Sequence, residues 1–211
     1  MPKPRFLIAL CLTLLTACAM PLTWADETTA PRPDQWAQPI NEHYNLYQMS
    51  PTLYRSALPD EAANPLLDEL HIGTVINFLP ESDDTWLKTS AIKTVQLPYR
   101  TNHVDDADVL AALRAIQTAQ AHGPVLMHCK HGVDRTGLIA AMYRVVVQDW
   151  RKEDALQEMI QGGYGENSHF KDGVSYMMNA DIPRLRAALS SGACSTSSFA
   201  SCALVGWFKP S

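Results

Sequence analysis

The stretch that decides the fold is His128-Cys129-Lys130-His131-Gly132-Val133-Asp134-Arg135-Thr136-Gly137. The apolar run Pro124–His128 leads into it and predicts a buried strand, which delivers Cys129 at its carboxyl end. The run Thr136–Trp150 follows and leaves almost no polar face, which predicts a helix inside a domain rather than on its surface. A loop of this length between a strand and a helix can curl around one tetrahedral anion.

The residue types of this loop suit the binding of phosphate. The backbone N–H groups of a curled loop can point inward as a nest for anionic oxygens, and a helix start adds free N–H donors and a positive dipole end. Gly132 permits backbone conformations that a side chain would block. Arg135 offers a planar fork of donors for two phosphate oxygens at once. The predicted phosphate-binding residues are Lys130, His131, Gly132, Val133, Asp134 and Arg135.

Cys129 lies where an ionised sulfur can act as a nucleophile. The pKa of a free cysteine, ~8.5, falls by several units close to helix N-termini and guanidinium groups. Attack on phosphorus gives a phosphocysteine intermediate that water then hydrolyses, while Arg135 and the loop amides stabilise the charge on the equatorial oxygens. Thr136 is expected to donate its hydroxyl to the sulfur, and His128 to support the loop by hydrogen bonding. This chemistry needs no metal and no cofactor.

Outside this segment, short apolar runs alternate with helical stretches. Strands are predicted at 52–55, 74–79 and 93–97, and helices at 61–70, 106–121, 155–160 and 181–189. The alternation predicts an α/β fold over residues 46–190, with a central, mostly parallel sheet flanked by helices.

The N-terminal residues predict export. Residues 1–25 have a positively charged start, an uncharged apolar run and small residues at Thr23 and Ala25, which is typical of a cleaved signal peptide. Alternatively, Leu15-Thr16-Ala17-Cys18 reads as a lipoprotein box that would lipidate Cys18. We therefore expect a periplasmic protein, attached to a membrane only if Cys18 is lipidated.

Two further segments flank the predicted domain. Residues 26–45 are polar and proline-containing, which predicts a tether without regular structure. Residues 191–211 form a tail, in which Cys194 and Cys202 are candidates for a disulfide in an oxidising compartment. The formal net charge of −5 and the absence of a basic stripe argue against a nucleic-acid partner.

The pattern His-Cys-x5-Arg-Thr-Gly is similar to the signature of the cysteine-based protein tyrosine and dual-specificity phosphatases. Leu53–Pro59 resembles the opening strand of their bacterial and atypical members, and the order of elements matches from about Ser50 to about Gly165. With the signal peptide, the chain looks most like the periplasmic tyrosine phosphatases of Gram-negative bacteria. The resemblance implies hydrolysis of phosphotyrosine, with phosphoserine and phosphothreonine as further options, on a phosphorylated protein of the cell envelope.

The resemblance also implies an aspartic acid that protonates the leaving group. The loop Tyr99–Asp108 occupies the right place, between a strand and a helix, but the relatives' acid aligns with Asn102. Asp105 is assigned the role here, with Asp106 and Asp134 as alternatives. Asp105 together with Asp108 also has the pattern of a helix N-cap, and Asp134 precedes the arginine as in some phosphoinositide phosphatases.

Two other functions stay open on the sequence. Lys130, His131 and Asp134 suggest a phosphoinositide or inositol-phosphate phosphatase, because extra positive charge in the loop favours highly charged substrates. The uncertain acid suggests a weakly active phosphate-binding or thiol redox-sensing module.

Overall fold

The computed structural model describes residues 31–165 and 171–197. The predicted signal peptide, the lipidation site at Cys18 and tail residues 198–211 lie outside these ranges. Within the described residues, no helix is both long enough and apolar enough to cross a bilayer.

A six-stranded mixed sheet forms the middle of the domain, in the spatial order β1-β2-β3-β6-β4-β5. Its strands are β1 (Gln38–Asn41), β2 (Leu46–Ser50), β3 (Leu53–Ser56), β4 (Thr74–Asn77), β5 (Lys93–Gln96) and β6 (Val125–His128). Strands β3, β6, β4 and β5 run parallel, whereas β2 is antiparallel to both β3 and β1. The prediction of an α/β fold with a mostly parallel sheet is confirmed, and β6 lies between β3 and β4 at its centre.

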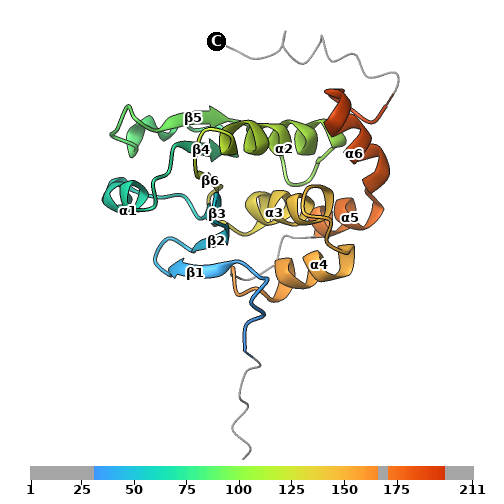
Figure 1. Ribbon diagram of the computed structural model, residues 1–211, viewed down its shortest axis with the longest axis horizontal. Helices are drawn as coiled ribbons and strands as arrows, with labels where there is room; N and C mark the ends of the chain where they lie inside the picture. Colours follow the sequence, from blue (N-terminus) through green and yellow to red (C-terminus); the bar gives the residue numbers. More distant parts are fainter. Residues whose placement is uncertain (1–30, 166–170, 198–211) are drawn as a thin grey trace, which may run out of the picture. The chain divides into compact units, whose positions relative to one another are not determined.

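The helices cover the two faces of the sheet unequally (Figure 1). They are α1 (Asn64–Glu69), α2 (Asp106–Gln120), α3 (Asp134–Val146), α4 (Lys152–Gln161), α5 (Lys171–Asn179) and α6 (Ile182–Ser191), with short 3-10 turns at Glu61–Ala63 and Asp83–Thr85. The larger core packs α2 and α3 against one face, and α1 packs on the other with a smaller core around Leu67, Trp86 and Leu126. All predicted helices are present, whereas α5 was not predicted.

Helix α3 is buried along its length, as its composition predicted. Every residue from Thr136 to Val146 is buried, including Arg144. The helix begins two residues before the predicted start and ends at Val146 instead of Trp150. Asp149, at φ 60°, has left-handed backbone conformation, which a right-handed helix cannot continue through.

The prediction of an unstructured tether is wrong for residues 32–45, because they belong to the domain. Arg32 donates from Nε to the carbonyl of Ala37 at 2.7 Å and from Nη1 to the carbonyl of Gly162 at 2.7 Å. Ala37 is fully buried, and strand β1 follows directly. Proline content misled the prediction, since Pro39 lies in an edge strand, where a missing N–H is tolerated. The first five tether residues, 26–30, lie outside the described ranges.

Candidate active site

Cys129 lies at the carboxyl end of the central strand β6, immediately before the loop that leads into α3. Its side chain is buried, with 3% of the residue exposed. In open α/β sheets, ligands bind outside the carboxyl ends of the parallel strands. The strand–loop–helix arrangement predicted from the sequence is therefore present, at the position in the sheet where a ligand is expected.

Gly132 allows the loop to fold closely against strand β3. Its φ is +72°, in the left-handed region. A Cβ atom at this position would lie 2.7 Å from the amide nitrogen of Ala57 and 2.7 Å from the carbonyl carbon of Ser56. Both are backbone atoms that cannot move aside separately, so glycine is required for conformation and for space.

The carbonyl groups of the loop accept hydrogen bonds from outside it. The amide nitrogen of Leu58 donates to the Lys130 carbonyl at 3.3 Å. The Nδ2 of Asn45 donates to the His131 carbonyl at 2.9 Å. Because these carbonyls point outward, the loop amides are left toward the inside. Within the described part of the chain, no backbone N–H from Lys130 to Val133 donates to a protein acceptor, which leaves them available to an anion.

Arg55 supports the loop from below and was not identified from the sequence as a site residue. Its Nη2 donates to the Gly132 carbonyl at 2.7 Å, and its guanidinium stacks 3.6 Å from the centre of the Tyr164 ring. Burial lowers the pKa of Arg55 from its usual value, while nearby Tyr164, Glu158 and Cys129 act in the opposite direction. A fully buried arginine at the end of the strand beside Cys129 fixes the loop and brings positive charge near the sulfur.

Arg135 is held by the ends of two neighbouring strands. Its Nη1 donates to the Phe78 carbonyl at 3.0 Å, just after β4. Its own carbonyl accepts from the Tyr99 hydroxyl at 2.7 Å, in the segment after β5. Burial first, and then the nearby Cys129, raises the pKa of Tyr99 well above its usual value, so this hydroxyl keeps its proton and remains a donor. The Phe78 carbonyl thereby orients the guanidinium, and the Tyr99 hydroxyl fixes the backbone of Arg135, before any substrate binds.

The His128 side chain faces the α1 side of the sheet. It contacts Asp83 there instead of the loop, so it supports the loop only by fixing the end of strand β6. Its Nε2 lies 3.1 Å from Oδ2 of Asp83. The other carboxylate oxygen of Asp83 accepts from Asn77 Nδ2 at 2.9 Å and from Trp86 Nε1 at 3.0 Å. The buried Asp83 was missed in the sequence, because only the fold brings it next to His128.

Thr136, the other predicted supporting residue, is fully buried. Its hydroxyl makes no hydrogen bond among the described residues, to the Cys129 sulfur or to any other group. The bond to sulfur predicted from the sequence is therefore not formed in this structure.

The mouth of the site is a cavity of about 480 Å³ beside Arg135. Its lining residues are Pro80, Pro98, Tyr99, Arg100, Thr101, Asn102 and Arg135. Asn102, at the position that aligns with the relatives' acid, thus borders the mouth, whereas Asp105 and Asp106 are not among the lining residues.

Asp105 caps helix α2. Its Oδ1 accepts from the amides of Ala107 at 2.8 Å and Asp108 at 3.0 Å, and the Asp108 carboxylate accepts from the Asp105 amide. In this reciprocal capping box each side-chain oxygen accepts from the backbone of the other residue. The structure therefore gives the carboxylate predicted as the catalytic acid a helix-capping position.

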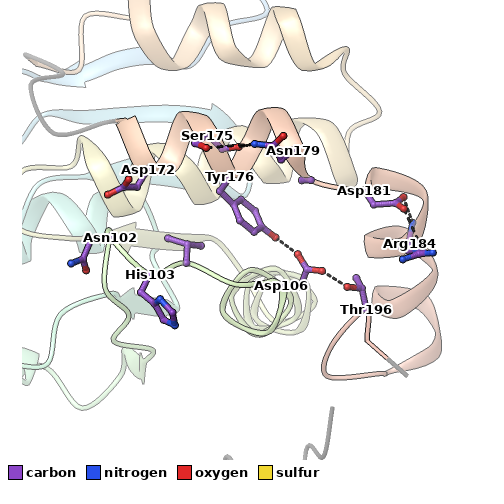
Figure 2. A pocket seen from close by; sticks show the side chains of 12 residues that line it. Asn102, His103, Asp106, Asp172, Ser175, Tyr176, Asn179, Asp181, Arg184 and Thr196 are labelled. Atoms are coloured by element: carbon purple, nitrogen blue, oxygen red, sulfur yellow. Dashed lines mark hydrogen bonds and ion pairs between the residues drawn. The ribbon is translucent and has the colours of Figure 1, made fainter. Parts of the chain in front are cut away.

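Asp106 joins α2 to the C-terminal part of the domain. It accepts from the Tyr176 hydroxyl at 2.6 Å and from the Thr196 hydroxyl, as Figure 2 shows. Asp106, Tyr176 and Thr196 line a second cavity, of about 500 Å³. Asn102 is the one lining residue that this cavity shares with the mouth. Asp106 accordingly serves as an anchor for α5 and the segment after α6.

Asp134 and Asp108 are two further carboxyl groups near the site. Asp134 begins α3 and lines a small cavity with Arg135 and Tyr99. Asp108 is partly buried, and burial raises its pKa to about 6.

Cys194 takes part in a disulfide, whereas its predicted partner Cys202 lies outside the described residues, so their pairing stays a prediction.

Comparison with known proteins agrees with this geometry. Residues 43–182 match the tyrosine phosphatase family. The chain is 50% identical over 183 residues, 87% of this chain and 84% of the relative, to the dual specificity protein phosphatase TpbA of Pseudomonas aeruginosa. A crystal structure of P. aeruginosa TpbA, as a cysteine-to-serine variant with phosphotyrosine, has 48% identity and a TM-score of 0.74, covering 76% of this chain and 99% of that one. An inositol diphosphatase of Arabidopsis thaliana, DSP5, is 28% identical over 70% of this chain and 74% of its own length. The chain, with its candidate phosphate-binding loop from Cys129 to Arg135, therefore belongs to the tyrosine phosphatase family.

Proposed function

We propose that this protein hydrolyses phosphotyrosine through a covalent phosphocysteine intermediate. The Cys129 sulfur attacks phosphorus, so the S–P bond forms as the bond from phosphorus to the phenolic oxygen breaks. Water then attacks phosphorus, the S–P bond breaks, and inorganic phosphate leaves with the thiolate restored. The electron pairs balance in each step without an external oxidant or reductant.

One observation supports this proposal above all others: a loop whose carbonyls are bound from outside surrounds a buried cysteine next to an immobilised arginine. The free amides from Lys130 to Val133 can bind the three non-bridging oxygens. Arg135, fixed by Phe78 and Tyr99, adds a bidentate cation. Preoriented donors stabilise a transition state without reorganising during the reaction. The phosphotyrosine bound in the TpbA crystal structure supports the same ligand here.

The test is turnover of p-nitrophenyl phosphate and of a phosphotyrosine peptide by the purified protein and by its Cys129→Ser variant. We expect wild-type hydrolysis of both and no measurable turnover by the variant, which still binds inorganic phosphate because the loop amides and Arg135 are intact. Phosphate binding without turnover in the wild type would instead indicate the phosphate-binding module considered from the sequence. Turnover by the serine variant at the wild-type rate would contradict the proposed nucleophile.

Inositol phosphates are a second candidate substrate class. Lys130 and His131 are exposed at the loop, and a relative at 28% identity is an inositol diphosphatase. The comparison is a substrate panel in which kcat/KM for phosphotyrosine peptide, phosphoserine peptide and inositol phosphates is measured under one condition. A higher value for inositol phosphates, lost in Lys130→Ala, would favour this second class.

We also propose that the protein is exported to the periplasm and acts there on envelope phosphoproteins. The supporting observation is the N-terminal sequence, with its charged start, apolar run and cleavage site at Ala25. Mass spectrometry of the mature N-terminus checks this proposal: cleavage after Ala25 leaves a soluble periplasmic product, whereas a lipidated Cys18 leaves a membrane-bound one. Retention of Met1 in the cytoplasmic fraction would contradict export.

A further inference from the structure

We propose that Asp134, inside the phosphate-binding loop, is the proton donor to the leaving group, which places the general acid on α3 instead of on the loop after β5. The inference rests on the proposed phosphatase function and specifies its acid. Phenolate is a poor leaving group, so the reaction on phosphotyrosine requires an acid near the bond that breaks.

The loop after β5 provides no free carboxyl group at the mouth. Asn102 borders the mouth, but a carboxamide has no acidic proton to transfer. Asp105 is held by two amides in the capping box, and Asp106 is held by Tyr176 and Thr196. Both carboxylates act as acceptors in structural hydrogen bonds, which protonation would weaken.

Asp134 differs from these carboxylates because its side chain has no hydrogen bond or ion pair within the described part of the chain. It is partly buried and directly precedes Arg135. Nothing among the described residues commits this carboxyl group to the fold, so it is free to exchange a proton with a bound ester.

The position of Asp134 relative to the mouth is given by the cavities. Asp134 lines a cavity of about 10 Å³ together with Arg135, Tyr99 and Thr101. Asp134 does not itself line the mouth, but Arg135, Tyr99 and Thr101 border both cavities. A space of this size holds about one water-sized probe, and a general acid can act directly or through one water.

The proton transfers balance over the two steps. In the first, the Asp134 carboxyl proton passes to the phenolic oxygen as that oxygen leaves phosphorus and the S–P bond forms. In the second, the Asp134 carboxylate takes a proton from the attacking water as the new O–P bond forms and the thiolate leaves. Tyr99 lies close to the charges of Cys129, Arg135, Asp108 and Asp134, so these groups are gathered around one phenol ring.

The experiment compares esters that differ only in their need for a proton. For the wild type, Asp134→Asn and Asp108→Asn, kcat/KM is measured with 2,4-dinitrophenyl phosphate, p-nitrophenyl phosphate and phenyl phosphate. Asp134→Asn is expected to lose about 10²–10⁴-fold on phenyl phosphate and less than about tenfold on the dinitrophenyl ester, whose leaving group needs no acid. Competitive inhibition by inorganic phosphate should not weaken in Asp134→Asn, because the loop amides and Arg135 remain, and Asp134→Glu should recover part of the phenyl phosphate activity.

Asp108→Asn is the matched control, because Asp108 also acts on Tyr99 but belongs to the capping box of α2. It should keep the wild-type dependence on leaving group. Equal losses on all three esters in Asp134→Asn, or a loss confined to phenyl phosphate in Asp108→Asn, would overturn the proposal. A wild-type kcat/KM that itself falls steeply from the dinitrophenyl to the phenyl ester would also overturn the proposal, because it would mean that no group protonates the leaving oxygen. Failure of the wild type to hydrolyse any ester would refute the phosphatase function itself. This outcome is therefore distinguishable from a failure of the Asp134 proposal alone.

Discussion

The close approach of Gly132 to strand β3 makes Gly132→Ala the most informative single substitution. The alanine Cβ would lie 2.7 Å from backbone atoms of both Ser56 and Ala57, and 2.8 Å from the Ser56 carbonyl oxygen. The φ of +72° adds a conformational penalty of about 1–2 kcal/mol for a residue with a Cβ. Relief of the overlap requires movement of the loop or the strand, at a further ~1–3 kcal/mol. We expect a total loss of stability of about 2–5 kcal/mol.

The same movement should lower activity, because the Gly132 carbonyl accepts the hydrogen bond from Arg55 and the neighbouring amides are the proposed donors to the phosphate. A misplacement of about 1 Å in a reacting group can reduce the rate by about 10²-fold. Stability is measured by urea unfolding with a constant m-value, and activity by kcat on p-nitrophenyl phosphate.

Gly192→Ala separates the two contributions. Gly192 has nearly the same φ, +77°, but a Cβ there would have no atom within 4 Å. This control should show only the conformational penalty of about 1–2 kcal/mol and wild-type activity. If Gly132→Ala were no less stable than Gly192→Ala and equally active, close packing of the loop on β3 would not be what fixes the site.

Three further outcomes follow from the contacts around the site. Tyr99→Phe removes the hydroxyl that donates to the Arg135 carbonyl, so kcat should fall by about tenfold, equivalent to ~1.4 kcal/mol. The free energy of unfolding should fall by about 1 kcal/mol. An unchanged kcat would mean that Arg135 is oriented without this hydrogen bond. Glu158→Gln leaves buried Arg144 without its ion pair at 2.8 Å and should lower unfolding free energy by about 3–5 kcal/mol in urea titrations, whereas a loss below about 1 kcal/mol would show that the pair is replaceable. Asp108→Asn should raise Tm at pH 7 but not at pH 4. Burial raises the pKa of Asp108 in the folded protein to about 6, so the wild type loses stability as pH rises through that value. An equal gain in Tm at both pH values would contradict this reasoning.

The sequence predicted the site's core because its components are contiguous. The strand, the loop with Cys129 and Arg135, and the buried helix lie within one segment, so local patterns are sufficient to predict them. Strands β4 and β6 were predictable for the same reason, since each is a short run that is buried at every residue.

Elements at the edge of the sheet were less visible. Strand β1, at one edge of the sheet, carries polar residues and Pro39, because an edge strand buries only part of its surface, and the neighbouring strand β2 is only partly buried. The tether prediction was therefore wrong for a segment whose structure depends on long-range contacts, such as that between Arg32 and Gly162.

The amino-acid sequence alone predicted the candidate nucleophile and phosphate-binding residues and determined the α/β fold, because these depend on neighbours along the chain. The tertiary structure alone decided which side chains hold the loop and which carboxyl groups are free. Arg55, Asp83 and Tyr99 reach the site from distant segments, and Asp105 and Asp106 are engaged in hydrogen bonds that separate them from the mouth. The availability of a proton donor depends on what surrounds each carboxyl group in space, and no spacing along the chain contains that information.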